Sequence, residues 1–292
     1  MRPIFKQNQE NNMHYYEFGW KTRKEHSIFA RCWEPKDVKA VVCLVHGLGE
    51  HSGRYAHVAK FLNDARYAVM AFDMCGHGKS DGIVGHATSY EAMMEHISRL
   101  RGEATVHYPE IPIFLYGHSM GGNLVINYTL YRKPRVYGVI ATGPAFRTAD
   151  VPPSWKIAMG KALYNVIPFL PMPSELDENK LSKDPEVVRA YVEDPLVHGR
   201  VSVRLGMDIL HTGQWVMKHA REFIAPLLIM HGEKDAITSC DASREFAEKA
   251  KHVCTLKIWD NLYHEIHNEP EKNEVLTYLL NWLDKQLEEK ME

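Results

Sequence analysis

The chain has few cysteines, and their arrangement excludes two kinds of site. Its 292 residues include five cysteines, an odd number with no C-x-x-C spacing, so neither a disulfide framework nor a zinc site is indicated. Such scattered cysteines are typical of a reducing compartment, and we expect a cytoplasmic protein. The five cysteines are Cys32, Cys43, Cys75, Cys240 and Cys254.

The chain also has no basic run, no acidic tail and no long apolar run. Its formal net charge is -2 at pH 7, which argues against a nucleic acid partner. No window holds the roughly 18 uncharged apolar residues that cross a bilayer, and the first twenty residues contain no apolar core of a secretory signal. We therefore expect any membrane contact to be peripheral. The 17 histidines occur without an H-E-x-x-H pair, so no metal site is predicted.

Short apolar runs alternate along the chain with amphipathic segments. The runs are rich in β-branched residues and are typical of buried strands, whereas the segments between them have helical periodicity. This alternation predicts an α/β fold with a mostly parallel sheet that helices cover on both faces. The predicted strands are residues 28–33, 41–46, 68–73, 113–117, 137–143, 227–232 and 255–260, and the predicted helices are 54–66, 89–108, the segment after Ser119, 241–250 and 274–290.

The alternation is interrupted once, between about residues 146 and 225. Seven prolines divide this stretch into apolar helical pieces such as "SWKIAMGKALYNVIPFL". We interpret it as an insertion that covers the carboxyl edge of the sheet. The predicted organisation is an N-terminal core part over 1–145, a cap over 146–225 and a C-terminal core part over 226–292.

Glycine is not abundant, yet three of the 19 glycines surround one serine in "GHSMGG". A catalytic serine at a sharp turn from strand to helix requires small residues two positions before and after it, where strand and helix pass closely. Gly117 and Gly121 meet that requirement around Ser119, between a predicted strand and a predicted helix. The alternative is a tight turn with a serine N-cap, which leaves the flanking glycines unexplained.

A serine hydroxyl needs a base, normally a histidine that a carboxylate orients. Asp235 directly follows the predicted strand 227–232, and His264 directly follows the strand 255–260, in the chain order Ser, acid, His of α/β-hydrolases. Asp150 is an alternative acid, because it follows the strand 137–143. His267 is an alternative base.

Three further side chains near these positions have structural interpretations. Asp241 is predicted to be an N-cap, and Asp260 a surface residue at a strand end. His118, next to the serine, is predicted to be buried and hydrogen-bonded.

The developing oxyanion needs two backbone N–H donors. One is expected to be the amide of Met120, directly after the nucleophile. The second is expected at Leu48 in "VVCLVHGLGE", where Gly47 and Gly49 allow the backbone to turn inward.

The same glycine loop supports a remote alternative. "VVCLVHGLGEHSG" followed by Asp73 resembles the start of a dinucleotide-binding unit of an oxidoreductase. Glu50, however, lies where a pyrophosphate would approach, and that interpretation gives Ser119, Asp235 and His264 no role. A non-catalytic binding module on the same fold is a further alternative. Against it, the chain has Ser119, Asp235 and His264 at all three positions that the reaction needs.

Several blocks together resemble the monoacylglycerol lipase family of serine hydrolases, over about residues 15–287. This resemblance implies the α/β-hydrolase fold, the triad Ser119, Asp235 and His264, the oxyanion donors Leu48 and Met120, and no cofactor. It also implies that Arg54, Tyr191 and His267 approach the glycerol end of the substrate. The blocks are "HGLGEHSGRY", "FDMCGHGKSDG", "GHSMGG", "YVEDPLV", "HGEKDAIT" and "YHEIHNEPE".

The resemblance implies cleavage of a monoacylglycerol into glycerol and a fatty acid. Lysophospholipid hydrolysis, general carboxylesterase activity and acyl transfer on the same triad are the alternatives. The apolar cap piece around Trp155 and Phe169 suits an acyl tunnel, a membrane surface or ordinary packing on the sheet. No oligomeric state is predicted.

Overall fold

The computed structural model describes residues 6–10 and 13–289. Within them the strands form a nine-stranded sheet, in the order β1-β2-β3-β5-β4-β6-β7-β10-β11, and a separate pair, β8 and β9. Six neighbouring strands of this sheet, β5, β4, β6, β7, β10 and β11, are mutually parallel. The strands β1, β2 and β3 pair antiparallel at one edge. The sheet strands are β1 Lys6–Glu10, β2 Met13–Lys21, β3 Ser27–Glu34, β4 Ala40–Val45, β5 Tyr67–Phe72, β6 Ile113–His118, β7 Gly138–Thr142, β10 Leu227–Gly232 and β11 Cys254–Trp259.

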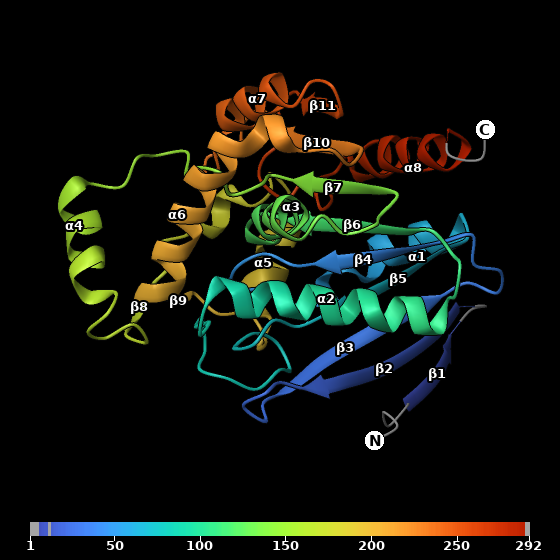
Figure 1. The fold of residues 1–292 in the computed structure, drawn as a ribbon, viewed down its shortest axis with the longest axis horizontal. Helices are drawn as coiled ribbons and strands as arrows, with labels where there is room; N and C mark the ends of the chain where they lie inside the picture. The colour runs from blue at the N-terminus through green and yellow to red at the C-terminus, as the bar shows by residue number, and fades with distance from the viewer. Residues whose placement is uncertain (1–5, 11–12, 290–292) are drawn as a thin grey trace.

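The central strands are buried on both faces because helices cover each side of the sheet. Alternate residues of β4 belong to two different cores: Val41 and Cys43 face one, and Val42 and Leu44 face the other. Helices α2, α3 and α7 cover the first face, and α1 and α8 cover the second; α2 and α3 lie in front of the sheet in Figure 1. The helices are α1 Ala56–Asp64, α2 Tyr90–His107, α3 Met120–Arg132, α7 Cys240–Lys249 and α8 Lys272–Glu288.

This architecture is the α/β-hydrolase fold, and the predicted fold class is confirmed. All seven predicted strands are present within two residues of their expected bounds. The strands β1 and β2 were not predicted. In β2 buried Tyr16 and Phe18 alternate with less buried Tyr15, Glu17 and Gly19, which is the pattern of a strand with one face in the core.

Between β7 and β10 the chain leaves the sheet and forms a helical excursion. Helix α6 packs against α3, and α4 stands farther from the sheet, at the left of Figure 1. These elements occupy the segment that we interpret as a cap over 146–225, and the division into core and cap stays a prediction. They are α4 Ser154–Leu163, β8 Pro171–Pro173, η2 Glu178–Lys180, α5 Pro185–Glu193, β9 Arg200–Ser202, α6 Val203–His219 and η3 Ala220–Glu222.

Two smaller expectations can be compared with the helices. The N-cap of α7 is Ser239, whose side chain accepts a hydrogen bond from the Ala242 amide. The prediction of Asp241 as the N-cap was therefore wrong, because this residue lies in the first turn instead. Among the helices of the described residues, each is too short or too polar to cross a bilayer.

Candidate active site

Ser119 lies at a strained turn between β6 and α3. Its backbone has φ 54° and ψ −117°, a conformation that residues other than glycine rarely adopt. A Cβ atom at Gly117 would lie 2.2 Å from the carbonyl oxygen of Gly121, and one at Gly121 would lie 2.2 Å from the carbonyl oxygen of Val45. Only glycine fits at these two positions, which is the steric reason expected from the sequence.

Asp235 and His264 meet at the carboxyl ends of β10 and β11. His264 Nδ1 lies 2.6 Å from Asp235 Oδ2, and both side chains are buried. A Cβ atom at Gly232 would lie 2.1 Å from the carbonyl oxygen of Tyr263. The missing side chain at Gly232 therefore allows the loop with His264 to pass close to the loop with Asp235.

The two groups shift each other's pKa in opposite directions. Burial lowers the pKa of His264, but the charge of Asp235 and its hydrogen bond outweigh burial and raise the pKa above its ordinary value. Burial raises the pKa of Asp235, but His264 and the hydrogen bond from His231 hold it well below its ordinary range. The pair thus supplies a carboxylate that stays ionised and an imidazole that is a stronger base than usual.

The alternative acids and the alternative base lie elsewhere. Asp150 is exposed at the rim of the cavity described below, and Asp241 and Asp260 are exposed. His267 is buried and stacks on Tyr55, with ring centroids 4.9 Å apart. The observed carboxylate contact of His264 is with Asp235.

His118 is buried beside the nucleophile, as expected. Its Nδ1 lies 3.0 Å from Thr142 Oγ1, and its ring centroid lies 4.7 Å from that of His264. Burial lowers the pKa of His118 strongly, and the neighbouring His264 and His267 lower it further. His118 is therefore neutral and adds no charge next to the serine.

The loop after β4 carries Leu48 and is held by several hydrogen bonds. Gly47 N donates to Glu50 Oε1 over 2.6 Å, and His198 N, between α5 and β9, donates to the Gly49 carbonyl over 2.8 Å. Gly49 has a positive φ of 79°, which favours glycine. Leu48 and Met120 both line the cavity that Ser119 lines, so the two proposed oxyanion donors belong to residues on its wall.

A cavity of about 500 Å³ opens above the serine. Ser119 and His264 both contribute to its lining, so the predicted nucleophile and the predicted base belong to the wall of one cavity. Residues between 151 and 210 supply much of the remaining wall as apolar side chains. The apolar side chains that line the cavity include Leu48, Met120, Ile157, Met172, Leu176, Leu181, Val203, Met207, Ile209, Leu210 and Ile237.

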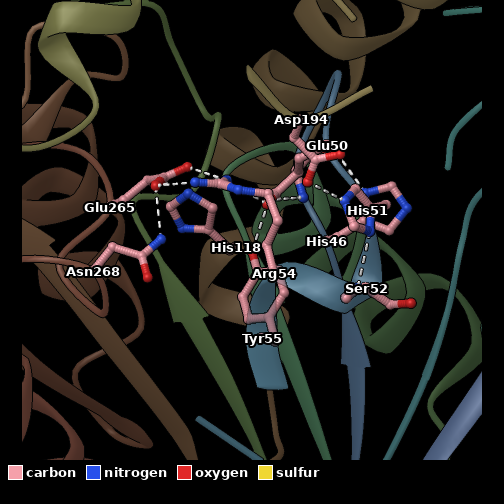
Figure 2. A network of polar contacts seen from close by, with 12 residues as sticks. His46, Glu50, His51, Ser52, Arg54, Tyr55, His118, Asp194, Glu265 and Asn268 are labelled. Atoms are coloured by element: carbon pink, nitrogen blue, oxygen red, sulfur yellow. Dashed lines mark hydrogen bonds and ion pairs between the residues drawn. The ribbon is translucent and has the colours of Figure 1, made fainter. Parts of the chain in front are cut away.

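A buried ion cluster lies beside this cavity (Figure 2). Arg54 Nη1 and Nη2 lie 2.5 and 2.7 Å from the two carboxylate oxygens of Glu265, and Nη1 also lies 2.8 Å from Glu50 Oε2. Both carboxylates are 2% exposed. Burial raises the pKa of Glu265, but Arg54 outweighs burial and holds it below its ordinary value. Glu265 is thus held as a carboxylate at the cavity wall.

The three residues that the resemblance assigned to the glycerol end lie at different depths. Tyr191 lines the cavity, with Arg54 Cζ 4.7 Å from its ring centroid. Arg54 and His267 do not belong to the described residues that line the cavity. Contact of these two with substrate therefore stays a prediction, and in the structure Arg54 contacts Glu50, Glu265 and Tyr191.

Two side chains that bear on the dinucleotide alternative make contacts within the protein. Glu50 binds the amide of Gly47 within the loop. Asp73 Oδ1 accepts hydrogen bonds from the amide and hydroxyl of Ser52. Within the described residues, no group of three His, Cys, Asp or Glu side chains is placed to hold a metal ion.

Comparison with known proteins identifies the family of this chain. A family model described as "Serine aminopeptidase, S33" matches residues 36–271. The chain belongs to this family. The S33 family member is 36% identical to a monoacylglycerol lipase of Mycolicibacterium smegmatis, over 90% of this chain and 97% of that protein.

Two further proteins resemble this S33 family member. A crystal structure of a monoacylglycerol lipase from Paleococcus ferrophilus has a TM-score of 0.80 and 36% identity, and it covers 94% of this chain and 99% of that one. An uncharacterized abhydrolase domain-containing protein of Dictyostelium discoideum is 37% identical over 91% of this chain, which spans only 29% of that longer protein. The expected resemblance to monoacylglycerol lipases is confirmed, and the S33 family member is a serine ester hydrolase.

Three residues of the site were not singled out from the sequence as functional. Glu265 directly follows His264 in the chain. Its partner in the buried ion cluster is Arg54, which is 211 positions away in the chain. His231 and Thr238 contact the carboxylate of Asp235. The block "HGEKDAIT" contains both of them, but their contacts depend on how the loop folds back.

Proposed function

We propose that the protein hydrolyses monoacylglycerols to glycerol and a fatty acid through an acyl-enzyme. The observation that supports this best is that Ser119 lines the same cavity of about 500 Å³ as His264, which pairs with Asp235, and that the wall of this cavity is largely apolar. Such a cavity excludes water from a fatty chain and favours apolar acyl groups.

The reaction follows from the proposed roles of these groups. His264 takes the proton of the Ser119 hydroxyl, whose oxygen attacks the ester carbonyl, and the amides of Leu48 and Met120 stabilise the oxyanion. His264 then protonates glycerol as it leaves. A water molecule, deprotonated by His264, hydrolyses the acyl-enzyme, while Asp235 keeps the imidazole oriented. These steps require neither a metal nor an organic cofactor.

The polar part of the cavity wall suits the glycerol group. Glu50, Glu265 and Tyr191 belong to the same lining as Ser119. Carboxylate oxygens accept hydrogen bonds from hydroxyl groups, and a tyrosine hydroxyl can donate or accept. We propose that these three side chains receive the free hydroxyls of the glycerol moiety, and that Arg54 fixes both carboxylates from behind.

We also propose that the cap rests on a lipid surface as a peripheral contact. Apolar side chains are exposed on and around α4, whose Trp155 is 61% exposed. Exposed aromatic and aliphatic groups on one segment favour an interface between water and lipid. The exposed residues of this patch are Val151, Trp155, Met159, Val166, Ile167, Phe169 and Leu170.

One observation favours a second candidate substrate, a lysophospholipid. Lys180 lines the cavity and has no ion-pair partner in the part of the chain that the structure describes. An ammonium group at the wall is suited to a phosphate. Monoacylglycerol remains the main proposal, since the relatives at 36% identity with high coverage carry that name, whereas a relative named a phospholipase, from Bacillus subtilis, is 30% identical.

An ester panel tests both candidates. Long-chain monoacylglycerols are expected to have higher kcat/KM than short p-nitrophenyl esters, diacylglycerols and lysophospholipids, measured with and without detergent micelles. Ser119→Ala is expected to abolish hydrolysis and labelling by a fluorophosphonate probe while the circular dichroism spectrum is retained. Preference for lysophospholipid would favour the second candidate, and normal turnover by Ser119→Ala would exclude the proposed nucleophile.

A further inference from the structure

A second histidine contacts the carboxylate oxygen that His264 uses. His231 Nε2 lies 3.0 Å from Asp235 Oδ2, and His264 Nδ1 lies 2.6 Å from the same oxygen. His231 is in β10, four residues before Asp235, and it is fully buried. The same carboxylate oxygen therefore lies within hydrogen-bond distance of two imidazoles, of which the proposed mechanism uses one.

The contacts of His231 determine where its hydrogen lies. Nε2 faces Asp235 Oδ2 and, at 3.3 Å, the carbonyl oxygen of Thr238. Both are acceptors. The Thr238 hydroxyl also lies 3.4 Å from Nε2, but it has two nearer acceptors for its hydrogen, Asp235 Oδ2 and the Gly143 carbonyl. We therefore infer that Nε2 carries a hydrogen. Nδ1 lies 2.8 Å from Ser243 Oγ of α7, and this hydroxyl can donate to it. Ser243 thus favours the tautomer in which His231 donates to Asp235.

The other donors around Asp235 do not replace this contact. The amides of Ile237 and Thr238 donate to Oδ1, the other carboxylate oxygen. The Thr238 hydroxyl lies 2.8 Å from Oδ2, but it also lies 3.0 Å from the carbonyl oxygen of Gly143. A hydroxyl has one hydrogen and cannot donate fully to both acceptors.

We propose that His231 is a positioning residue for the reaction: by donating from Nε2 to Asp235 Oδ2, it fixes the carboxylate and reduces the charge that His264 experiences. The inference rests on the proposed roles of Asp235 and His264. A carboxylate that shares its charge with a second donor stabilises the protonated form of His264 less. His231 therefore keeps the imidazole of His264 neutral to a lower pH than Asp235 alone would allow.

The remaining charged and titratable groups near His264 are expected to stay in place when His231 is replaced. They come from the loop after β4, from β6 and from the loop after β11, whereas His231 comes from β10. A shift of the His264 titration in a His231 variant is therefore attributable to the contact with Asp235. The groups besides Asp235 are Glu50, His118, Glu265 and His267.

Two amide variants separate this contact from the packing of the side chain. In His231→Gln the amide nitrogen reaches about as far as Nε2 and keeps a donor for Asp235. In His231→Asn the shorter amide reaches about as far as Nδ1, and keeps only the contact with Ser243. We expect His231→Asn to lower kcat by about 10- to 100-fold, with KM unchanged and the acidic limb of the pH–rate profile at higher pH. His231→Gln is expected to resemble the wild type in both.

Direct titration makes the result independent of the substrate. Histidine NMR of the free protein is expected to show a higher pKa of His264 in His231→Asn than in the wild type, even if monoacylglycerol is not the substrate. His96→Asn is the control, since His96 is also buried but lies on α2 beside Trp20; it is expected to leave the His264 titration unchanged.

Three results would overturn the proposal. The first is a pH profile and a kcat of His231→Asn equal to those of the wild type, and the second is an equal loss in the Asn and Gln variants, which would indicate packing alone. If neither variant folds, nitrogen-15 shifts of the wild-type protein still decide: they must show hydrogen on Nε2 of His231, and a neutral tautomer with hydrogen on Nδ1 alone would refute the inference.

Discussion

Replacing Arg54 with Met should destabilise the protein much more than its single positive charge suggests. The change removes two hydrogen bonds to Glu265 and one to Glu50, and it leaves two carboxylates that are each 2% exposed without a cation. Breaking a buried ion pair by removing one partner costs about 3–5 kcal/mol. We expect a loss of that size in the free energy of unfolding at pH 7, measured by urea unfolding followed through tryptophan fluorescence.

The pH dependence provides a second check of the same reasoning. In the wild type the pKa of Glu265 is lowered from its ordinary 4.5, so this group stabilises the fold above pH 4.5 and that stability is lost as the pH falls through the lowered value. Without Arg54, burial raises the pKa of Glu265, and protonation at mildly acidic pH relieves the repulsion. The difference in stability between variant and wild type should therefore shrink as the pH falls from 7 to 5.

A matched control uses a surface arginine. Arg132 pairs with Glu91, and both side chains are at least 40% exposed, so Arg132→Met should cost about 0–1 kcal/mol. The double variant Arg54→Met with Glu265→Gln should recover part of the loss, because one unpaired carboxylate is removed. A urea midpoint of Arg54→Met equal to that of Arg132→Met would refute the assignment of the cluster as a buried, charged network.

Three further predictions concern the triad. Ser119→Gly should be more stable than Ser119→Ala by about 1 kcal/mol, because relief of a backbone strain of about 1–3 kcal/mol exceeds the entropy cost of glycine of about 0.5–1 kcal/mol; equal urea midpoints would contradict the strained turn at φ 54°. Asp235→Asn should lower kcat about a thousandfold or more, whereas Asp150→Asn should not, and the reverse result would reassign the acid. Because the pKa of His264 is raised above 6.5 and the base must be neutral, kcat/KM should fall as the pH decreases through a value above 6.5; full activity well below pH 6 would exclude His264 as the base.

The parts of the fold that the sequence predicts are those set by local pattern. The six residues of β4 are all buried, and a strand buried on both faces appears as a continuous apolar run that is easily recognised. Strand β2 escaped prediction because its buried residues alternate with partly exposed ones, among them Glu17. An alternating run that contains charged residues has no such contrast with its surroundings.

The candidate site divides in the same way. Ser119, Asp235 and His264 each stand at a recognisable place, directly after a predicted strand, and the glycines around Ser119 have a steric reason that can be stated without a structure. The cluster of Arg54 with Glu265 joins residues 211 positions apart. Nothing in the pattern near either residue indicates this partner. The resemblance to a family located Arg54 near the substrate, but only the packed structure shows that its guanidinium binds two carboxylates.

The charges of the site are held by side chains that the proposed reaction does not consume. Asp235 receives hydrogen bonds from two backbone amides, the Thr238 hydroxyl and His264, and His231 Nε2 lies 3.0 Å from its Oδ2. Glu50 is fixed by the Gly47 amide, the Tyr55 hydroxyl and Arg54. A group that must reorient during a reaction adds to the barrier, whereas a group already fixed by several partners does not. The same arrangement makes these side chains costly to replace singly, because each substitution leaves a buried partner without its hydrogen bond. Loss of activity and loss of stability should therefore coincide at Arg54 and separate at Ser119, where the functional side chain is also the strained one.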